Sequence, residues 1–194
     1  MSDDRVHIVS SQLLIDDWAR LTKYTIDFKR RDGRVERQIR QVYDRGDGAV
    51  ILPIDPDRQT VLLIRQFRMP VYLTDGNGFI IEACAGLLDE NDPETAIRKE
   101  AEEELGYHIK EVTRILVAYG SPGSVKERLS YFLAHYTPAD RILAGGGAEH
   151  EGEDIEVIEL PVAEALAMVR RGEICDAKTV ILLQHVALFG DGLK

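Results

Sequence analysis

GLLDENDPETAIRKEAEEELGY, residues 86 to 107, follows the apolar segment FIIEACA and predicts an acidic helix docked on a buried strand. Asp92 can cap the helix N-terminus, and Pro93 fits the first helical position. Gly106 fits the left-handed position that commonly ends a helix. The apolar side of the helix, which is expected to dock on a sheet, consists of Ala96, Ile97, Ala101 and Leu105.

Carboxylates gather on a second side of this helix. At about 3.6 residues per turn, Glu100, Glu103 and Glu104 share a face that adjoins the apolar side. Like charges at this spacing destabilise an isolated helix by about 0.2 to 0.5 kcal/mol per pair, so a compensating positive charge is expected. The backbone carbonyl of Ala85, next to Gly86, can approach the same carboxylates, and Mg²⁺ prefers oxygen ligands of this kind. A magnesium site is favoured over the alternative, a solvated acidic face.

The same stretch resembles the signature box of the Nudix hydrolases, which hydrolyse nucleoside diphosphates linked to another group. Asp92 stands where that family has a Glu, Lys99 replaces an Arg, and one residue fewer separates the two. Asp92 or Glu94 could pair with Lys99 in place of the family's Glu–Arg ion pair, and Arg98 is expected to pair with Glu102 one turn further on. The matching positions are Gly86, Glu100, Ala101, Glu103, Glu104, Gly106 and Tyr107.

The rest of the chain predicts two parts. Residues 6 to 43 form a β meander with a turn at RDG, too small to be stable without a covering surface. Short apolar runs from Ala49 onward predict buried strands, and helices are expected at about 161–171 and 179–189. With the resemblance, we expect a mixed α/β chain: an antiparallel β domain at 1–45 for dimerisation and substrate contacts, and a Nudix α/β/α sandwich around a mixed sheet at 46–194.

Composition narrows the classes of function. The formal net charge of −10 disfavours binding to nucleic acid. Cys84 and Cys175 stand far apart without metal-site spacing, so neither zinc nor a disulfide framework is expected. No apolar run suggests a membrane span and the first residues lack signal-peptide character, so we expect a cytoplasmic protein without a membrane partner.

Across nearly the whole chain, the sequence resembles the GDP-mannose hydrolases, which are related to the ADP-ribose pyrophosphatases and form homodimers. This resemblance implies Mg²⁺-dependent hydrolysis of a nucleotide sugar, GDP-mannose giving GMP and mannose 1-phosphate, with Mn²⁺ as another possible cofactor. ADP-ribose, giving AMP and ribose 5-phosphate, is the nearest alternative. A non-catalytic nucleotide-sugar sensor and a Ca²⁺-stabilised structural protein are further alternatives, although no EF-hand pattern is present. The segments that carry the resemblance are VYDRG (42–46), VLLIRQFR (61–68), EACAGLLD (82–89), SPGSVKE (121–127), AGGG with EDIEVIELP (144–161) and GEICDAKTV (172–180).

The resemblance also implies the roles of individual residues. Glu103 would be a metal ligand or support one. In the glycine-rich loop GGGAEHEGED, Glu151 would be the general base and Glu153 a metal ligand, with His150 ranked second as base and Glu149 also open. The full set of implied metal ligands is Ala85 (through its carbonyl), Glu100, Glu104 and Glu153.

Substrate contacts are expected from several elements. Arg65 and Arg68 have guanidinium groups that suit a pyrophosphate, although Arg65 could be a surface arginine of an edge strand. Trp18 could stack on the base or serve packing, and Lys178 could reach a phosphate or remain solvated. Glu127 could bind substrate or pair with its neighbours Lys126 or Arg128. The complete predicted set is Trp18, Arg40, Gln41, Arg65, Arg68, Gly86, Leu87, Glu127 and Lys178.

Overall fold

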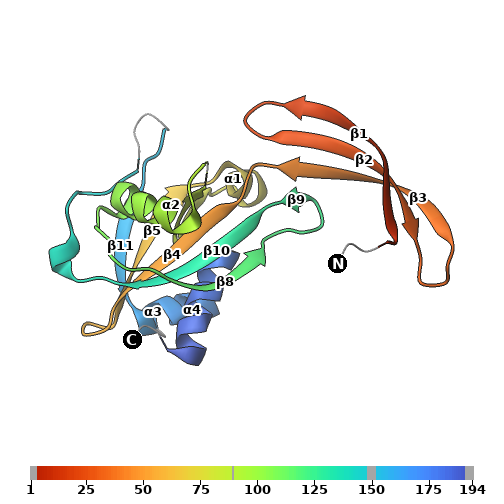
Figure 1. Cartoon of the computed structure of the whole chain (residues 1–194). Helices are drawn as coiled ribbons and strands as arrows, with labels where there is room; N and C mark the ends of the chain where they lie inside the picture. The colour runs from red at the N-terminus through yellow and green to blue at the C-terminus, as the bar shows by residue number, and fades with distance from the viewer. Residues whose placement is uncertain (1–3, 89, 148–151, 191–194) are drawn as a thin grey trace. The chain divides into compact units, whose positions relative to one another are not determined.

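The computed structural model describes residues 4–88, 90–147 and 152–190 (Figure 1). Its contacts divide the chain into two compact units. The first contains the chain up to Asp47 together with Tyr119–Arg128, and the second contains Gly48–Ala118 with the chain from Leu129 onward. None of the helices in the described ranges has the length and apolar character needed to cross a bilayer.

The first unit is a sheet with the strand order β1-β2-β3-β9. The predicted meander is confirmed as β1 (Val6–Asp16), β2 (Arg20–Lys29) and β3 (Val35–Asp44), which pair antiparallel. Gly33, with φ of +87°, makes the predicted turn between β2 and β3. Strand β9 (Val125–Lys126) adds in parallel to β3, an association over more than 80 residues of sequence that the pattern did not predict.

The second unit contains a mixed sheet with the order β11-β5-β4-β10-β8, with β6 paired to β5 and β7 paired to β4. β10 runs parallel to β4, while β4 pairs antiparallel with β5 and β7. The strands of this sheet are β4 (Gly48–Asp55), β5 (Thr60–Phe67), β6 (Phe79–Glu82), β7 (Cys84–Leu87), β8 (Thr113–Tyr119), β10 (Arg128–His135) and β11 (Glu156–Pro161).

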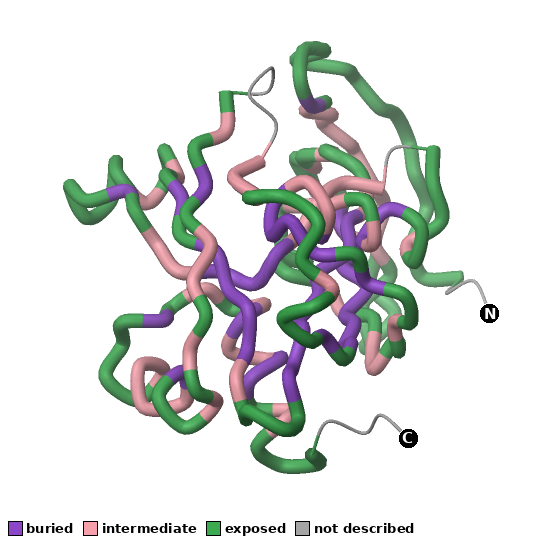
Figure 2. Tube along the Cα trace, turned by 90° about the vertical axis from the view of Figure 1, so that its left-hand side faces the viewer, coloured by how far each residue is buried: buried purple, intermediate pink, exposed green. Residues whose placement is uncertain are grey.

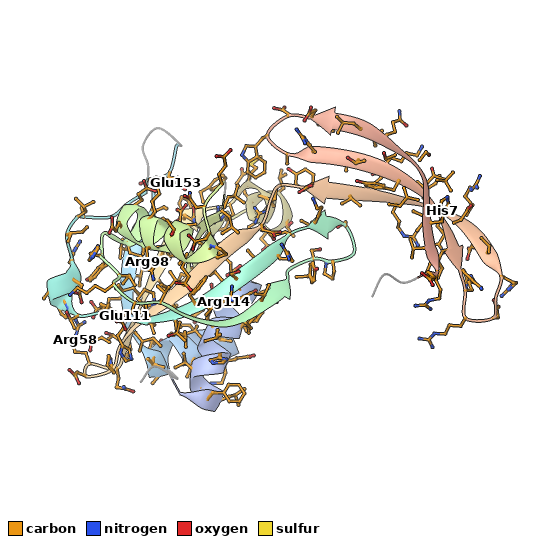
Figure 3. The ribbon with its side chains drawn as sticks, viewed as in Figure 1. His7, Arg58, Arg98, Glu111, Arg114 and Glu153 are labelled. Carbon is orange, nitrogen blue, oxygen red and sulfur yellow. The ribbon has the colours of Figure 1, made fainter. Side chains whose placement is uncertain are left out.

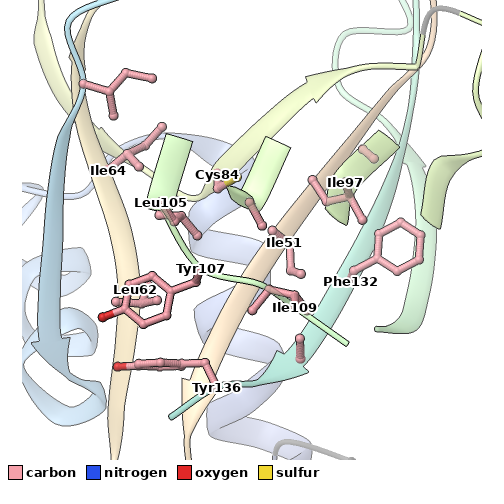
Figure 4. Packing of buried hydrophobic residues seen from close by; sticks show 14 residues of the cluster. Ile51, Leu62, Ile64, Cys84, Ile97, Leu105, Tyr107, Ile109, Phe132 and Tyr136 are labelled. Atoms are coloured by element: carbon pink, nitrogen blue, oxygen red, sulfur yellow. The ribbon is translucent and has the colours of Figure 1, made fainter. Parts of the chain in front are cut away.

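Helices cover both faces of this sheet, which confirms the predicted sandwich (Figure 1). Successive residues of β4 and β5 alternate between two apolar clusters, as a sheet buried on both faces requires. Figure 2 shows the buried residues along the trace, and Figure 4 shows one of the two clusters. One cluster combines Ile51, Leu62, Ile64 and Phe132 with Ile97, Ala101 and Leu105 of the acidic helix. The other combines Val50, Leu52, Val61 and Leu63 with Ala165, Leu182 and Leu183. The helical elements are α1 (Met69–Asp75), α2 (Pro93–Glu100), η1 (Ala101–Leu105), η2 (Pro138–Asp140), α3 (Val162–Arg171) and α4 (Ala177–Phe189).

The acidic helix differs from the prediction at its C-terminal end. Residues 93 to 100 form α2 with Asp92 as the predicted cap, but Ala101–Leu105 form a π-helix. The wider turn is closed by Gly106 N–H, which donates to Ala101 O five residues earlier, and Gly106 ends it in the left-handed conformation as predicted. Single π turns inside helices occur frequently at functional sites, because they change the directions of neighbouring side chains.

The ion pairs predicted along this helix are wrong. Arg98 pairs with Glu94, one turn before it, at 3.4 Å, and not with Glu102. Glu102 Oε1 lies 2.6 Å from His108 Nδ1, because the chain turns back after Gly106 and brings His108 beside it. Lys99 Nζ lies 3.3 Å from Glu103, while Asp92 accepts hydrogen bonds from two backbone N–H groups of the first turn.

Candidate functional site

The carboxylate of Glu100 lies directly against the backbone of β7. A Cβ atom built on Gly86 would stand 2.1 Å from Glu100 Oε1, so only glycine leaves room for this approach. The neighbouring residue Ala85 donates its N–H to Glu104 Oε2 at 3.2 Å. Strand β7 and the acidic helix therefore place two carboxylates beside the Ala85–Gly86 backbone. The contact to Glu104 is made by the Ala85 N–H, and the predicted role of the Ala85 carbonyl stays a prediction.

Glu104 is a buried carboxylate in negatively charged surroundings. Glu104 is only 2% exposed. Burial, together with the charges of Glu100 and Glu153, raises the pKa of Glu104 to about 8. Hydrogen bonds from the Cys84 thiol and from Ala85 N–H oppose this rise only in part. Burial and the charge of Glu104 in turn raise the pKa of the Cys84 thiol well above its usual value. A cation at this position would stabilise the ionised form of Glu104.

A glycine-rich segment, Gly145–Gly147, brings Glu153 to the same place. Gly146 N–H donates to Glu104 O at 2.9 Å, and Gly147 N–H donates to Glu103 O at 3.1 Å, so the segment satisfies the carbonyls that end the π-helix. A Cβ on Gly147 would lie 2.5 Å from Glu153 Oε2, which shows that this carboxylate packs against the segment. Figure 3 shows Glu153 beside the acidic helix.

These groups are chemically suited to a hard divalent cation. Three carboxylates and the Ala85 carbonyl supply only oxygen donors, and Gly86 keeps open the space that one carboxylate occupies. Within the described ranges, however, no three or more His, Cys, Asp or Glu side chains are already arranged to hold a metal ion. Binding would therefore require these carboxylates to turn toward a common point, and their roles as ligands stay a prediction.

A second cluster of charges lies at the end of β6. Buried Glu82 accepts hydrogen bonds from Arg68 Nε at 2.7 Å and from Lys178 Nζ at 2.5 Å. Lys178 also donates to Asp176 at 2.9 Å, and its side chain is only 14% exposed. The structure thus brings together Arg68 and Lys178, both predicted to bind substrate, and the alternative of a solvated Lys178 is wrong.

The other predicted residues of this unit lie nearby in the sheet. Arg65 projects from β5 and contacts Glu156 at 3.3 Å and the ring of Phe79 at 4.9 Å. β5 lies between β11 and β4, so Arg65 is not on an edge strand. Leu87 follows Gly86 at the end of β7 and is half-buried.

Four predicted substrate contacts belong to the first unit. The side chain of Trp18 is largely exposed, at 69%, which is inconsistent with a place in the core. Arg40 and Gln41 lie side by side in the exposed part of β3. Glu127 is buried and accepts a hydrogen bond from Arg45 Nε at 2.7 Å. Lys126 and Arg128 pair with aspartates of the same unit, so the alternative pairing predicted for Glu127 is wrong.

The proposed general base and its alternatives, Glu149, His150 and Glu151, lie outside the described residues. Two acidic residues of this cluster were not predicted from the sequence: Glu82, which contacts both Arg68 and Lys178, and Asp176, which contacts Lys178. A signal for Glu82 exists, because it is the only charged residue in the apolar run FIIEACA. A single charge in a buried strand must have a partner, although the sequence does not say which one.

Both units of the chain are similar to known proteins. The family description "NUDIX domain" matches residues 44–182, and "GDP-mannose pyrophosphatase NudK N-terminal domain" matches residues 5–43. A GDP-mannose pyrophosphatase of Pectobacterium atrosepticum is 52% identical over 187 residues, which cover 95% of each chain. One from Citrobacter koseri is 48% identical over 94% of this chain and 95% of its own. The crystal structure of an ADP compounds hydrolase superposes with a TM-score of 0.72 at 17% identity, covering 99% of this chain and 98% of that chain, a likeness of fold.

Proposed function

The chain belongs to the Nudix hydrolases, and from that premise we propose that it hydrolyses the pyrophosphate bond of GDP-mannose to GMP and mannose 1-phosphate. One observation carries this proposal above all. Identity near 50% to GDP-mannose pyrophosphatases extends over 95% of the chain and therefore includes both units, and not the Nudix domain alone. The carboxylates at the acidic helix would hold the metal ion that this hydrolysis requires.

Ala85 O, Glu100, Glu104 and Glu153 would hold Mg²⁺, with Mn²⁺ as another suitable ion. When bound, such an ion polarises phosphoryl oxygens, lowers the pKa of an attacking water and stabilises the leaving phosphate. Glu104, buried and of raised pKa, would be held in its ionised form by that charge. Glu103, which contacts Lys99, would support the neighbouring ligands from the helix side.

The remaining roles concern proton transfer and substrate binding. Glu151 would remove a proton from the attacking water, a role proposed from the sequence alone. Arg68 and Arg65 would contact the phosphates, since guanidinium groups match phosphate oxygens bidentately. The N-terminal part, residues 1–45, would supply further contacts to the nucleotide through Trp18 and its neighbours, and residues 46–194 would form the hydrolase domain.

The first unit also supports a homodimer. Strand β1 is exposed along its full length although it carries many apolar side chains. Exposed apolar residues in such a group are typical of an association surface, and a second copy of the chain is the proposed partner. The exposed apolar residues of β1 are Val6, Ile8, Val9, Leu13, Leu14 and Ile15. Light scattering at micromolar concentration should give twice the chain mass of 21.8 kDa, and the mass of a single chain would contradict the dimer.

Chromatography of products from a panel of nucleotide sugars tests the reaction itself. With Mg²⁺, GDP-mannose should give GMP and mannose 1-phosphate faster than ADP-ribose gives AMP and ribose 5-phosphate, and a chelator should abolish both reactions. Repeating the reaction in ¹⁸O-labelled water shows which phosphorus the water attacks. Binding of GDP-mannose without any metal-dependent product would instead favour a sensor.

A further inference from the structure

Glu82 is a buried carboxylate that the proposed mechanism does not use. Its Oε2 accepts from Arg68 Nε at 2.7 Å and its Oε1 accepts from Lys178 Nζ at 2.5 Å, while its side chain is 4% exposed. We propose that Glu82 is a positioning residue that holds these two cations as a clamp for the phosphates of the substrate. This inference rests on the proposed hydrolysis of a pyrophosphate and adds to it a residue that orients the substrate-binding groups.

Glu82 fixes the orientation of the Arg68 guanidinium. Glu82 engages the Nε of this group, and within the described ranges the structure gives the two terminal nitrogens no hydrogen-bond partner. The Arg68 side chain is 40% exposed, so these nitrogens can meet a ligand. A guanidinium fixed through Nε presents its terminal N–H groups in one plane, which is the geometry that binds a phosphate bidentately.

Glu82 and Asp176 together hold the Lys178 ammonium group. This group bridges the two carboxylates, so two of its three N–H groups are used. Asp176 also accepts from Thr179 N–H at 2.9 Å, and Thr179 Oγ1 accepts from Ala83 N–H at 2.7 Å. These hydrogen bonds join the first turn of α4 to Ala83, the residue between β6 and β7, and hold Lys178 in one place.

The register of β5 and β6 places Glu82 on the face of the sheet that the acidic helix covers. Glu82 stands opposite Ile64, and Gln66 lies two residues further along β5 on the same face. Ile64 belongs to the apolar cluster beneath the acidic helix. Gln66 is 6% exposed, and its Nε2 has no hydrogen-bond partner among the described residues. A buried donor without an acceptor is costly, so Gln66 Nε2 is an unsatisfied polar group on the face of the sheet that Glu82 shares.

The test uses the full chain with two readouts. The first is the Kd of inorganic pyrophosphate by calorimetry, and the second is KM, kcat and the half-saturating Mg²⁺ concentration with GDP-mannose. Glu82→Gln replaces an acceptor by an amide donor that faces a cation, so we expect Kd and KM to rise about 10- to 100-fold, in line with the loss of a charge-assisted hydrogen bond. The half-saturating Mg²⁺ concentration should change less than about twofold. In an Arg68→Gln background, Glu82→Gln should cost less than the product of the separate effects.

Glu82→Asp covers the case in which Glu82→Gln fails to fold. It keeps the negative charge between the two cations but shortens the side chain by one methylene, so the folded variant should bind pyrophosphate more weakly than the wild type. Wild-type Kd and KM in folded Glu82→Asp, or effects of Glu82→Gln and Arg68→Gln that multiply fully, would overturn the positioning role. If Glu82→Gln weakens the binding of pyrophosphate while the wild type leaves GDP-mannose intact, the positioning role stands and only the proposed hydrolysis is contradicted.

Discussion

Replacing Glu104 by Gln should stabilise the metal-free protein while removing its activity. Glu104 ionises in the folded chain only at a pKa of about 8, against an ordinary value of 4.5, because it is buried beside Glu100 and Glu153. A carboxyl group with a raised folded pKa contributes stability that is fully present below pH 4.5 and lost as the pH rises through about 8. The total loss is roughly 5 kcal/mol at 1.36 kcal/mol per pKa unit. Gln keeps the hydrogen-bond acceptor and is never charged, so it avoids this loss.

Chemical denaturation in the presence of a chelator measures this effect. Between about pH 5.5 and about pH 8.5, the free energy of unfolding of the wild type should fall by about 3 kcal/mol relative to that of Glu104→Gln. Glu94→Gln, an exposed change of the same kind on the same helix, is the matched control and should follow the wild type. Added Mg²⁺ should restore stability to the wild type at about pH 8.5 but much less to Glu104→Gln. A variant that is no more stable than the wild type at high pH, or that retains full turnover, would refute the reasoning.

Three further changes probe the same site. Gly86→Ala adds a Cβ only 2.1 Å from Glu100 Oε1, which forces the Glu100 carboxylate to move. Turnover should fall by about 10- to 100-fold with an unchanged circular dichroism spectrum, and normal turnover would contradict the packing. Gly147→Ala adds a Cβ 2.5 Å from Glu153 at a φ of +83°, so the melting temperature and turnover should both fall, as calorimetry and product assays would show. Glu151→Gln should lower kcat by about 10²- to 10⁴-fold with little change in KM, and an unaltered kcat at several pH values would exclude it as the base.

The sequence predicts most of the fold because its signals are local. Short continuous apolar runs such as AVILPI and TVLLIRQF predict buried strands, and the structure confirms that these strands are buried on both faces. Asp92 and Gly106 likewise mark the ends of the acidic helix, where the cap and the left-handed turn are found. Residues close in sequence thus carry enough information to place both elements.

The features that the sequence does not predict depend on contacts between distant segments. The π turn at 101–105 is fixed by the docking of Gly145–Gly147 onto its carbonyl groups, about 40 residues further along the chain. Glu82 finds Lys178 across 96 residues, so its partner is apparent only after folding. The same holds for β9, whose pairing with β3 joins Tyr119–Arg128 to the first unit. Such pairings follow from tertiary proximity, which no helical or strand periodicity encodes.

The central claim is that the carboxylates beside Ala85 and Gly86 support Mg²⁺-dependent cleavage of GDP-mannose. The most direct measurement is ³¹P NMR of GDP-mannose incubated with the folded chain and Mg²⁺, with Glu104→Gln alongside. The two pyrophosphate signals should disappear with the wild type, replaced by the two phosphomonoester signals of GMP and mannose 1-phosphate, and should persist with Glu104→Gln. Pyrophosphate signals that persist with the wild type, or that disappear equally with the variant, would contradict the claim.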